Sequence, residues 1–161
     1  MATSPFEHLQ VAPNLVCEFF GAFSRFEFAL KESTFFRSGR NSRAAPNWDL
    51  FGEKYGKLLA TKSDPALLDA VHYLLQKPPQ VQVVENKSIQ WKKLSLRGTT
   101  DGARVIDAVQ RVRNNLFHGG KHSPHSPPGR DERLVRSALV VLDACIGLNE
   151  ELRFNYENSK F

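Results

Sequence analysis

The sequence has few of the residues from which disulfide frameworks are built. Only two cysteines, Cys17 and Cys145, occur among its 161 residues, and both fall in apolar patterns with helical spacing. We expect both to be reduced residues of the core, because a free cysteine behaves as a small hydrophobic side chain. A chain of this length can bury a core without staples, so we expect a single domain over residues 1–161.

Long apolar runs are also lacking. No segment approaches the roughly 20 apolar residues that a membrane-spanning helix needs. The first ten residues, MATSPFEHLQ, do not place a basic stretch before an apolar one, as a secretion signal does. We therefore expect a cytoplasmic protein with no membrane partner.

Familiar ligand-binding motifs are absent or incomplete. The stretch GEKYGK, Gly52 to Lys57, resembles a phosphate-binding loop, but it has one residue too few between its glycines and Leu58 where a Ser or Thr should follow. Three histidines, at 118, 122 and 125, have helical spacing, but glycines and prolines between them prevent a helix. We expect no metal site and no cofactor.

Acidic residues are outnumbered, which leaves a net charge of +5 and a pI of about 9.4. The basic residues are spread along the chain instead of forming one run. This balance favours a polyanionic partner, such as a nucleic acid, only modestly over other partners.

Apolar spacing predicts a mainly α-helical protein of about five helices. The expected helices span residues 14–36, 48–60, 63–76, 101–118 and 131–154, and a small β-hairpin or extended arm spans 81–96. Asp64 should cap the third helix, with Pro65 in its first position. The segment 37–47 carries three arginines and is predicted to be a mobile basic loop; its alternative interpretation is a loop that contacts phosphate.

The segment RVRNNLFHGGK, residues 111–121, ends the fourth expected helix with a cluster of polar residues. Gly119 and Gly120 are sufficient to stop the helix, so the cluster needs a separate explanation. One explanation is structural: the arginines are solvated, Asn115 helps the helix to end, and His118 interacts with the helix dipole. The other explanation is chemical.

Helix geometry limits the chemical explanation. Residues five apart, such as Arg113 and His118, are separated by about 140° around an ideal helix, whereas Asn114 and His118 share a face. Arg113 and His118 could act on one substrate atom only if the helix end unwinds, or if the same segment of a second chain faces it.

The stretch RNNLFH, Arg113 to His118, resembles the Arg-x4-His form of the motif of the HEPN superfamily. The stretch FSRFEFALK, Phe23 to Lys31, is similar to the first helix of small HEPN proteins, and the order of helices is also similar. The resemblance implies a HEPN-like helical bundle that dimerises and brings two motifs together. Many members are metal-independent endoribonucleases that serve as toxins or phage-defence effectors.

The resemblance assigns catalysis to Arg113, His118 and Asn114. It also suggests a place near the site for Glu27. Separately, a tight turn at Gly119 and Gly120 would let the Lys121 ammonium approach a phosphate, although the glycines can equally be an ordinary helix stop. Arg111 and Asn115 are further candidates for substrate binding. RNA carries its own nucleophile, the 2′-hydroxyl, which one histidine can deprotonate while a second protonates the leaving oxygen. Histidine suits both tasks because its ordinary pKa is about 6.5.

The expected partners are RNA, a second copy of the chain, and an antitoxin or another defence component. Toxins of the group silenced by a nucleotidyltransferase carry a tyrosine two residues after the histidine, where this chain has Gly120. We therefore do not expect that mode of control. Two other hypotheses are a non-catalytic HEPN module that binds RNA, a nucleotide or a protein, and a helical antitoxin or scaffold.

Overall fold

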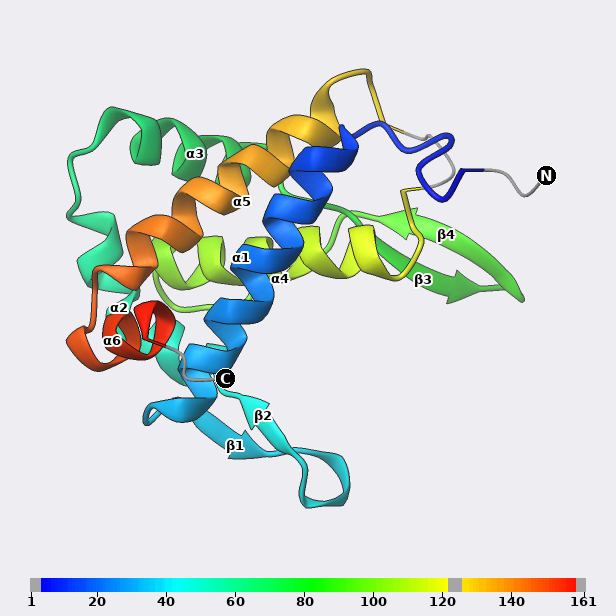
Figure 1. Cartoon of the computed structure of the whole chain (residues 1–161). Coiled ribbons are helices and arrows are strands. Elements are labelled where there is room, and N and C mark those ends of the chain that lie inside the picture. The colour runs from blue at the N-terminus through cyan, green and yellow to red at the C-terminus, as the bar shows by residue number, and fades with distance from the viewer. Residues whose placement is uncertain (1–3, 122–125, 159–161) are drawn as a thin grey trace.

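The computed structural model describes residues 4–121 and 126–158 as a mainly helical protein with two small antiparallel sheets (Figure 1). The helices described are α1 Pro13–Glu32, α2 Trp48–Ala60, α3 Pro65–Gln76, α4 Asp101–Phe117, α5 Arg130–Ile146 and α6 Glu150–Glu157. The strands are β1 Phe36–Ser38, β2 Ala44–Pro46, β3 Val81–Glu85 and β4 Ser88–Lys92, with a short 3-10 turn η1 at Arg40–Ser42.

Polar side chains cap four of these helices and explain where they begin. The side chains of Asn47, Asp64, Thr100 and Asn149 each accept a hydrogen bond from a backbone amide in the first turn of α2, α3, α4 and α6, respectively. The cap expected at Asp64 is confirmed: Oδ2 lies 2.8 Å from the amide of Leu67, and Pro65 opens the helix.

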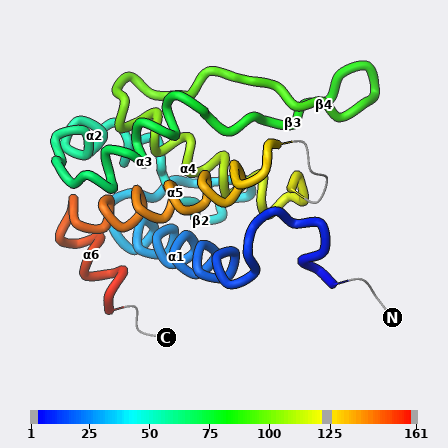
Figure 2. Tube along the Cα trace, turned by 90° about the horizontal axis from the view of Figure 1, so that it is seen from above, coloured from blue at the N-terminus to red at the C-terminus, as the bar shows by residue number. Residues whose placement is uncertain are grey.

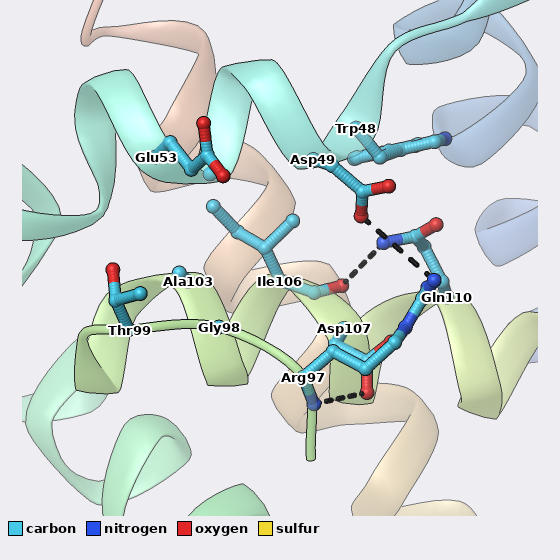
Figure 3. Close-up of a pocket in the computed structure, with 11 residues that line it drawn as sticks. Trp48, Asp49, Glu53, Arg97, Gly98, Thr99, Ala103, Ile106, Asp107 and Gln110 are labelled. Carbon is cyan, nitrogen blue, oxygen red and sulfur yellow. Dashed lines mark hydrogen bonds and ion pairs between the residues drawn. The ribbon is translucent and has the colours of Figure 1, made fainter.

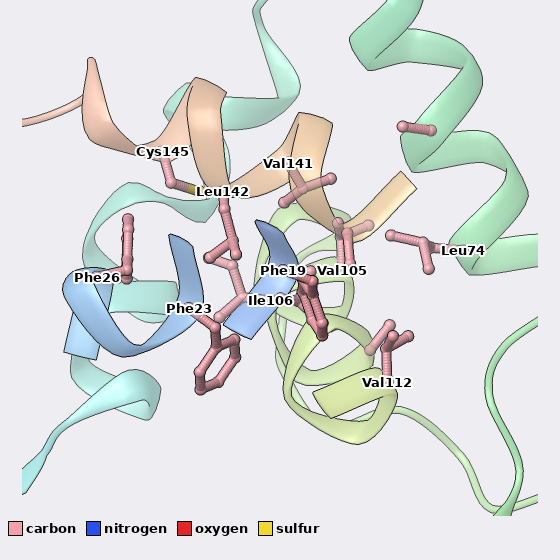
Figure 4. Packing of buried hydrophobic residues seen from close by; sticks show 14 of the residues in the cluster. Phe19, Phe23, Phe26, Leu74, Val105, Ile106, Val112, Val141, Leu142 and Cys145 are labelled. Atoms are coloured by element: carbon pink, nitrogen blue, oxygen red, sulfur yellow. The ribbon is translucent and has the colours of Figure 1, made fainter. Parts of the chain in front are cut away.

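Helix α5 contacts α1, α3 and α4, while α2 packs mainly on α4 (Figure 2). The apolar stripe predicted on the fourth helix is buried, at Val105, Val109, Val112 and Leu116. Aromatic side chains of α1 face it across the core (Figure 4). One hydrophobic cluster draws residues from all six described helices, so the end of α4 rests on a continuous core.

The arm predicted over 81–96 is confirmed as the hairpin β3–β4. Its register pairs Val81 with Lys92 and Glu85 with Ser88. Asn86 and Lys87 both have positive φ, which suits the tight turn of a two-residue hairpin loop. The hairpin extends away from the helices (Figure 1).

The structure differs from the sequence prediction at both ends of the chain. The first helix ends at Glu32 instead of continuing to residue 36, and the Ser33 hydroxyl donates to the carbonyl of Leu30 there. Residues 131–154 form two helices, because the chain turns through Gly147 and Asn149 caps α6. The periodic spacing spans this break since Leu148 and Leu152 are both buried.

Two further predictions were wrong. Residues 37–47 are not an irregular loop, because β1 and β2 pair as an antiparallel hairpin. Cys17 is exposed on α1, whereas Cys145 is buried as expected. The two cysteines are not bonded to each other. Among the described helices, none combines the length and apolar character needed to cross a bilayer.

Candidate functional site

The end of α4 presents a group of polar side chains on the surface. The helix ends at Phe117, the amide of His118 donates to the carbonyl of Asn114 at 2.9 Å, and Gly119 has φ +77°. This positive φ is the backbone conformation that favours glycine. Asn114 and His118 are both exposed, one turn apart on the same face.

Arg113 is partly buried and lies over aromatic rings. Its guanidinium carbon is 5.4 Å from the ring centre of Phe23 and 5.6 Å from that of Phe117. Its Nη1 donates to Oδ1 of Asn114 at 3.1 Å. Cation–π contact and a hydrogen bond therefore hold a permanently charged, planar donor group at the surface.

An exposed aromatic pair includes the Phe117 ring that lies under this arginine. The rings of Phe20 and Phe117 are 5.4 Å apart, and these side chains are 55% and 38% exposed. Phe20 belongs to α1 and Phe117 to α4, so the contact joins the two helices at the surface. We call Phe20, Phe117, Arg113, Asn114 and His118 the α4-end patch. Apolar spacing placed Phe20 together with Phe19 on the wide buried face of α1, so its exposure was not predicted.

His118 is exposed, and no hydrogen bond or ion pair to its imidazole occurs among residues 4–121 and 126–158. The structure brings Arg113 and Asn114 into direct contact, but it records no contact between Arg113 and His118. This agrees with the helix geometry: the two side chains leave α4 in different directions.

Arg111 and Asn115 lie elsewhere and support the fold. Arg111 donates to the carbonyls of Leu94 and Ser95 at 2.7 and 2.6 Å and pairs with Asp107 at 2.9 Å. The buried Asn115 donates from Nδ2 to the carbonyl of Gln80 at 2.7 Å. Both side chains therefore attach α4 to the segments that flank the β3–β4 hairpin.

Lys121 is also buried away from the α4-end patch. Its ammonium lies 2.7 Å from Oδ1 of Asp131 and 5.2 Å from the ring centre of Trp91. Gly120 makes this packing possible, since a Cβ there would lie 2.9 Å from the Trp91 ring. Gly120 is thus required because its backbone lies close to the Trp91 ring, whereas Gly119 is required because its φ is positive.

Glu27 accepts a hydrogen bond from the indole of Trp48, with 3.1 Å between Oε1 and Nε1. The Trp48 ring is 5.2 Å from Phe23, which in turn lies under Arg113. Glu27 is therefore connected to the α4-end patch through two aromatic rings, and no direct contact with Arg113 or His118 is found in the described part of the chain.

A cleft of about 410 Å³ lies between α2, α4 and residues 97–99 (Figure 3). Asp49, Arg97 and Gln110 stand at one end, with Glu53 and Thr99 toward the other. Gln110 precedes Arg113 by three residues, so this wall of the cleft and the patch lie on neighbouring turns of α4. Sequence reasoning did not find this cleft, because its walls come from separate segments.

Buried Asp107 fixes one wall of the cleft. It accepts from the amide and Nε of Arg97, at 3.0 and 2.8 Å, and from Arg111. The hydrogen bond to Asp107 raises the pKa of Arg97 despite partial burial. An aspartate between the apolar residues Ile106 and Ala108, followed four residues later by an arginine, was the signal in the sequence for this arrangement.

The residues described do not include a group of three or more His, Cys, Asp or Glu side chains placed to hold a metal ion. His122 and His125 lie outside the described residues, so the structure describes only His118 of the three histidines that have helical spacing in the sequence.

The comparisons find no similar protein: no family model matches the chain, and no curated protein and no solved structure matches it significantly.

Proposed function

We propose that the chain is an endoribonuclease of the HEPN type, with its site at the α4-end patch of two chains. The observation that carries the proposal is the placement of Arg113. Its guanidinium lies over Phe23 and Phe117, bonds Asn114, and forms no ion pair with a carboxylate in the described residues. A cation held at the surface without a counterion is suited to a substrate phosphate.

The exposed aromatic residues support pairing of two chains. Phe20 and Phe117 place apolar rings beside polar groups that would act on a substrate. Burying those rings against a second copy would bring a second Arg113 and His118 to the same place. This arrangement removes the difficulty that Arg113 and His118 of one helix diverge.

The reaction is a transfer within the RNA strand. One His118 accepts the proton of the 2′-hydroxyl, whose oxygen attacks the adjacent phosphorus. The bond from phosphorus to the 5′ oxygen breaks, and the second His118, in its protonated form, donates a proton to that oxygen. Arg113 stabilises the charge on the phosphate oxygens, and Asn114 holds Arg113 through their hydrogen bond. The products are a 2′,3′-cyclic phosphate and a 5′-hydroxyl.

The test is a gel assay of total RNA and a labelled tRNA with purified protein in excess EDTA. We expect wild type to cleave both substrates, and His118→Ala and Arg113→Ala each to slow cleavage by about 10²-fold or more. His72→Ala and Arg153→Ala are matched controls, since both side chains are exposed on other helices. DNA of the same sequence should stay intact because it lacks the attacking hydroxyl.

Failure of folded, dimeric wild type to cut any RNA would contradict the ribonuclease and favour a binding module. Binding of an uncleavable RNA that persists in His118→Ala would then identify nucleic acid as its ligand. Equal loss of cleavage in the control variants would show that the activity depends on overall stability, and undiminished cleavage by every variant would show that it belongs to a contaminant.

A further inference from the structure

The β1–β2 hairpin carries an unusual concentration of positive charge. Arg37, Arg40 and Arg43 lie within seven residues and are all exposed, and no Asp or Glu occurs anywhere from residue 33 to residue 48. The hairpin extends beyond the helices at the end of α1 (Figure 1). Its charge therefore faces solvent on several sides.

None of these three guanidinium groups has a hydrogen bond or an ion pair with any described residue. Other arginines of the protein, such as Arg97, Arg111 and Arg136, pair with carboxylates. Guanidinium groups close together repel one another, so three without counterions are more easily understood as a surface that meets an anion.

The base of the hairpin is firmly attached to the core. Phe35, just before β1, is buried, with its ring 5.3 Å from Phe51 and 5.7 Å from Tyr55. The amide of Asn47, just after β2, donates to the carbonyl of Phe35 at 2.8 Å. Near the tip, the amide of Gly39 donates to the carbonyl of Arg43 at 2.7 Å. These bonds hold the arginines at set spacings, which lowers the entropy cost of binding a ligand.

One face of the hairpin also offers an aromatic ring. Phe36 is 59% exposed and pairs across the hairpin with Pro46, whereas Arg37 pairs with Ala45 and projects from the opposite face. The partner residues are small, so they leave the ring and the guanidinium uncovered. Exposed aromatic rings near cations are the combination that binds single-stranded nucleic acid, because a base stacks on the ring while the cations contact phosphates. Since Phe36 and Arg37 lie on opposite faces, the strand must pass over the edge of the two-stranded hairpin to reach both.

The hairpin is connected to the α4-end patch through the core. Trp48 follows the hairpin after one residue, its ring lies 5.2 Å from Phe23, and Phe23 lies 5.4 Å from the guanidinium carbon of Arg113. Both strands contact α1, the helix that also carries Phe20. Phe23 and Trp48 are themselves buried, so these contacts fix the position of the hairpin relative to Arg113 from inside the core.

We propose that the β1–β2 hairpin is an arm that binds single-stranded RNA beside the cleavage site. Arg37, Arg40 and Arg43 bind phosphates of the strand, and Phe36 stacks on one base. The choice of RNA over DNA as the ligand rests on the proposed function. Binding of the strand by the hairpin, however, does not require cleavage. Guanidinium groups, whose paired N–H donors match phosphate oxygens, together with a ring for stacking, favour a nucleic acid over an anionic membrane, because binding to a membrane needs a larger apolar surface.

The experiment measures binding of a fluorescent 20-nucleotide oligouridylate with 2′-O-methyl groups, which cannot be cleaved, by anisotropy over a range of salt concentrations. We expect Arg37→Ala/Arg40→Ala/Arg43→Ala to weaken binding by about tenfold or more at low salt. The slope of log K against log salt should fall by about 2, at roughly 0.7 for each phosphate contact with a single strand. The matched control is Lys57→Ala/Lys62→Ala/Arg153→Ala, which removes the same charge from exposed positions on and after α2 and on α6.

Phe36→Ala tests stacking separately from charge. It should weaken binding roughly tenfold and leave the salt slope unchanged, since no phosphate contact is lost. Phe154→Ala, at an exposed phenylalanine of α6, should have no effect. Because all the substituted side chains are exposed, we expect every variant to fold. Circular dichroism of each variant checks this.

Equal weakening by the hairpin triple variant and the control triple variant would overturn the proposal, because binding would then follow net charge alone. Binding of vesicles containing phosphatidylserine through the same arginines, with no affinity for the oligonucleotide, would also overturn it. The ribonuclease can fail separately: hairpin-dependent RNA binding by a protein that cuts no RNA would support the arm and contradict catalysis.

Discussion

The ammonium of Lys121 lies 2.7 Å from Oδ1 of Asp131, and both side chains are buried. The pair joins the segment after α4 to the first turn of α5. It also gives Lys121 a partner inside the protein, at a position where the sequence suggested contact with a substrate.

Replacing Lys121 with Met should destabilise the protein by about 3–5 kcal/mol, because the carboxylate of Asp131 would stay buried without its cation. Urea unfolding followed by circular dichroism measures the change. Arg136→Met is the matched control: Arg136 pairs with Glu132 at 2.8 Å on the surface, so its loss should cost less than about 1 kcal/mol. Unchanged stability with weaker RNA binding in Lys121→Met would instead support the substrate-binding role.

The exposed pair Phe20 and Phe117 should decide the oligomeric state. We expect wild type to be a dimer by light scattering at tens of micromolar, and Phe20→Ser/Phe117→Ser to be a folded monomer that has lost RNA cleavage. The reason is that the Phe117 ring lies under Arg113 and the Phe20 ring packs on Phe117, at the place where a second chain would complete the site. Phe154→Ser, at 63% exposure on α6, should remain dimeric. A monomeric wild type that cleaves RNA would contradict the composite site.

Gly102 and Gly56 let α4 and α2 approach each other closely. A Cβ on Gly102 would collide with the backbone of Gly56, and backbone atoms cannot move aside as a flexible side chain does. Gly102→Ala should therefore lower the free energy of unfolding by several kcal/mol or prevent folding, because it overpacks the contact between the two helices. Gly21→Ala is the opposite case: with nothing within 4 Å of its Cβ position in α1, it should stabilise the protein by about 0.5–1 kcal/mol. Thermal unfolding of both variants gives the comparison.

The two cysteines should differ in reactivity. Cys17 is exposed, whereas burial raises the pKa of Cys145 to about 12. A thiol reagent at pH 8 should modify one thiol per chain in the folded protein and two in urea, because the thiolate is the reacting form. Rapid modification of both thiols in the folded protein would contradict the packing of α5.

The same pKa shift predicts a dependence of stability on pH. The folded protein keeps the Cys145 proton above the ordinary thiol value of 9.0, while the unfolded chain loses it. The contribution of the protonated Cys145 thiol to the free energy of unfolding is therefore complete below pH 9, and it is lost as the pH rises from about 9 to 12. Wild type should lose stability faster than Cys145→Ala over that range in urea unfolding, and parallel curves would contradict the shift.

Local signals in the sequence predicted most of the helical elements. Apolar spacing located α2, α3 and α4, with a cap predicted for α3 at Asp64, and β-branched residues on both sides of a polar turn located the β3–β4 hairpin. Spacing was misleading where buried leucines continue across a turn, as between α5 and α6. Composition was misleading at residues 37–47, where glycine, serine and proline predicted a loop, but two very short strands pair to form a hairpin.

The sequence by itself determined the polar cluster at the end of α4, because helix period and the two glycines place Asn114 and His118 on one exposed face. Only the tertiary structure decided which of the clustered residues are available to a ligand. Arg111, Asn115 and Lys121 meet carbonyls and carboxylates from distant segments, while Arg113 meets the rings of Phe23 and Phe117. The physical reason is that periodicity fixes the direction of a side chain, whereas its partner depends on which remote segment packs against it.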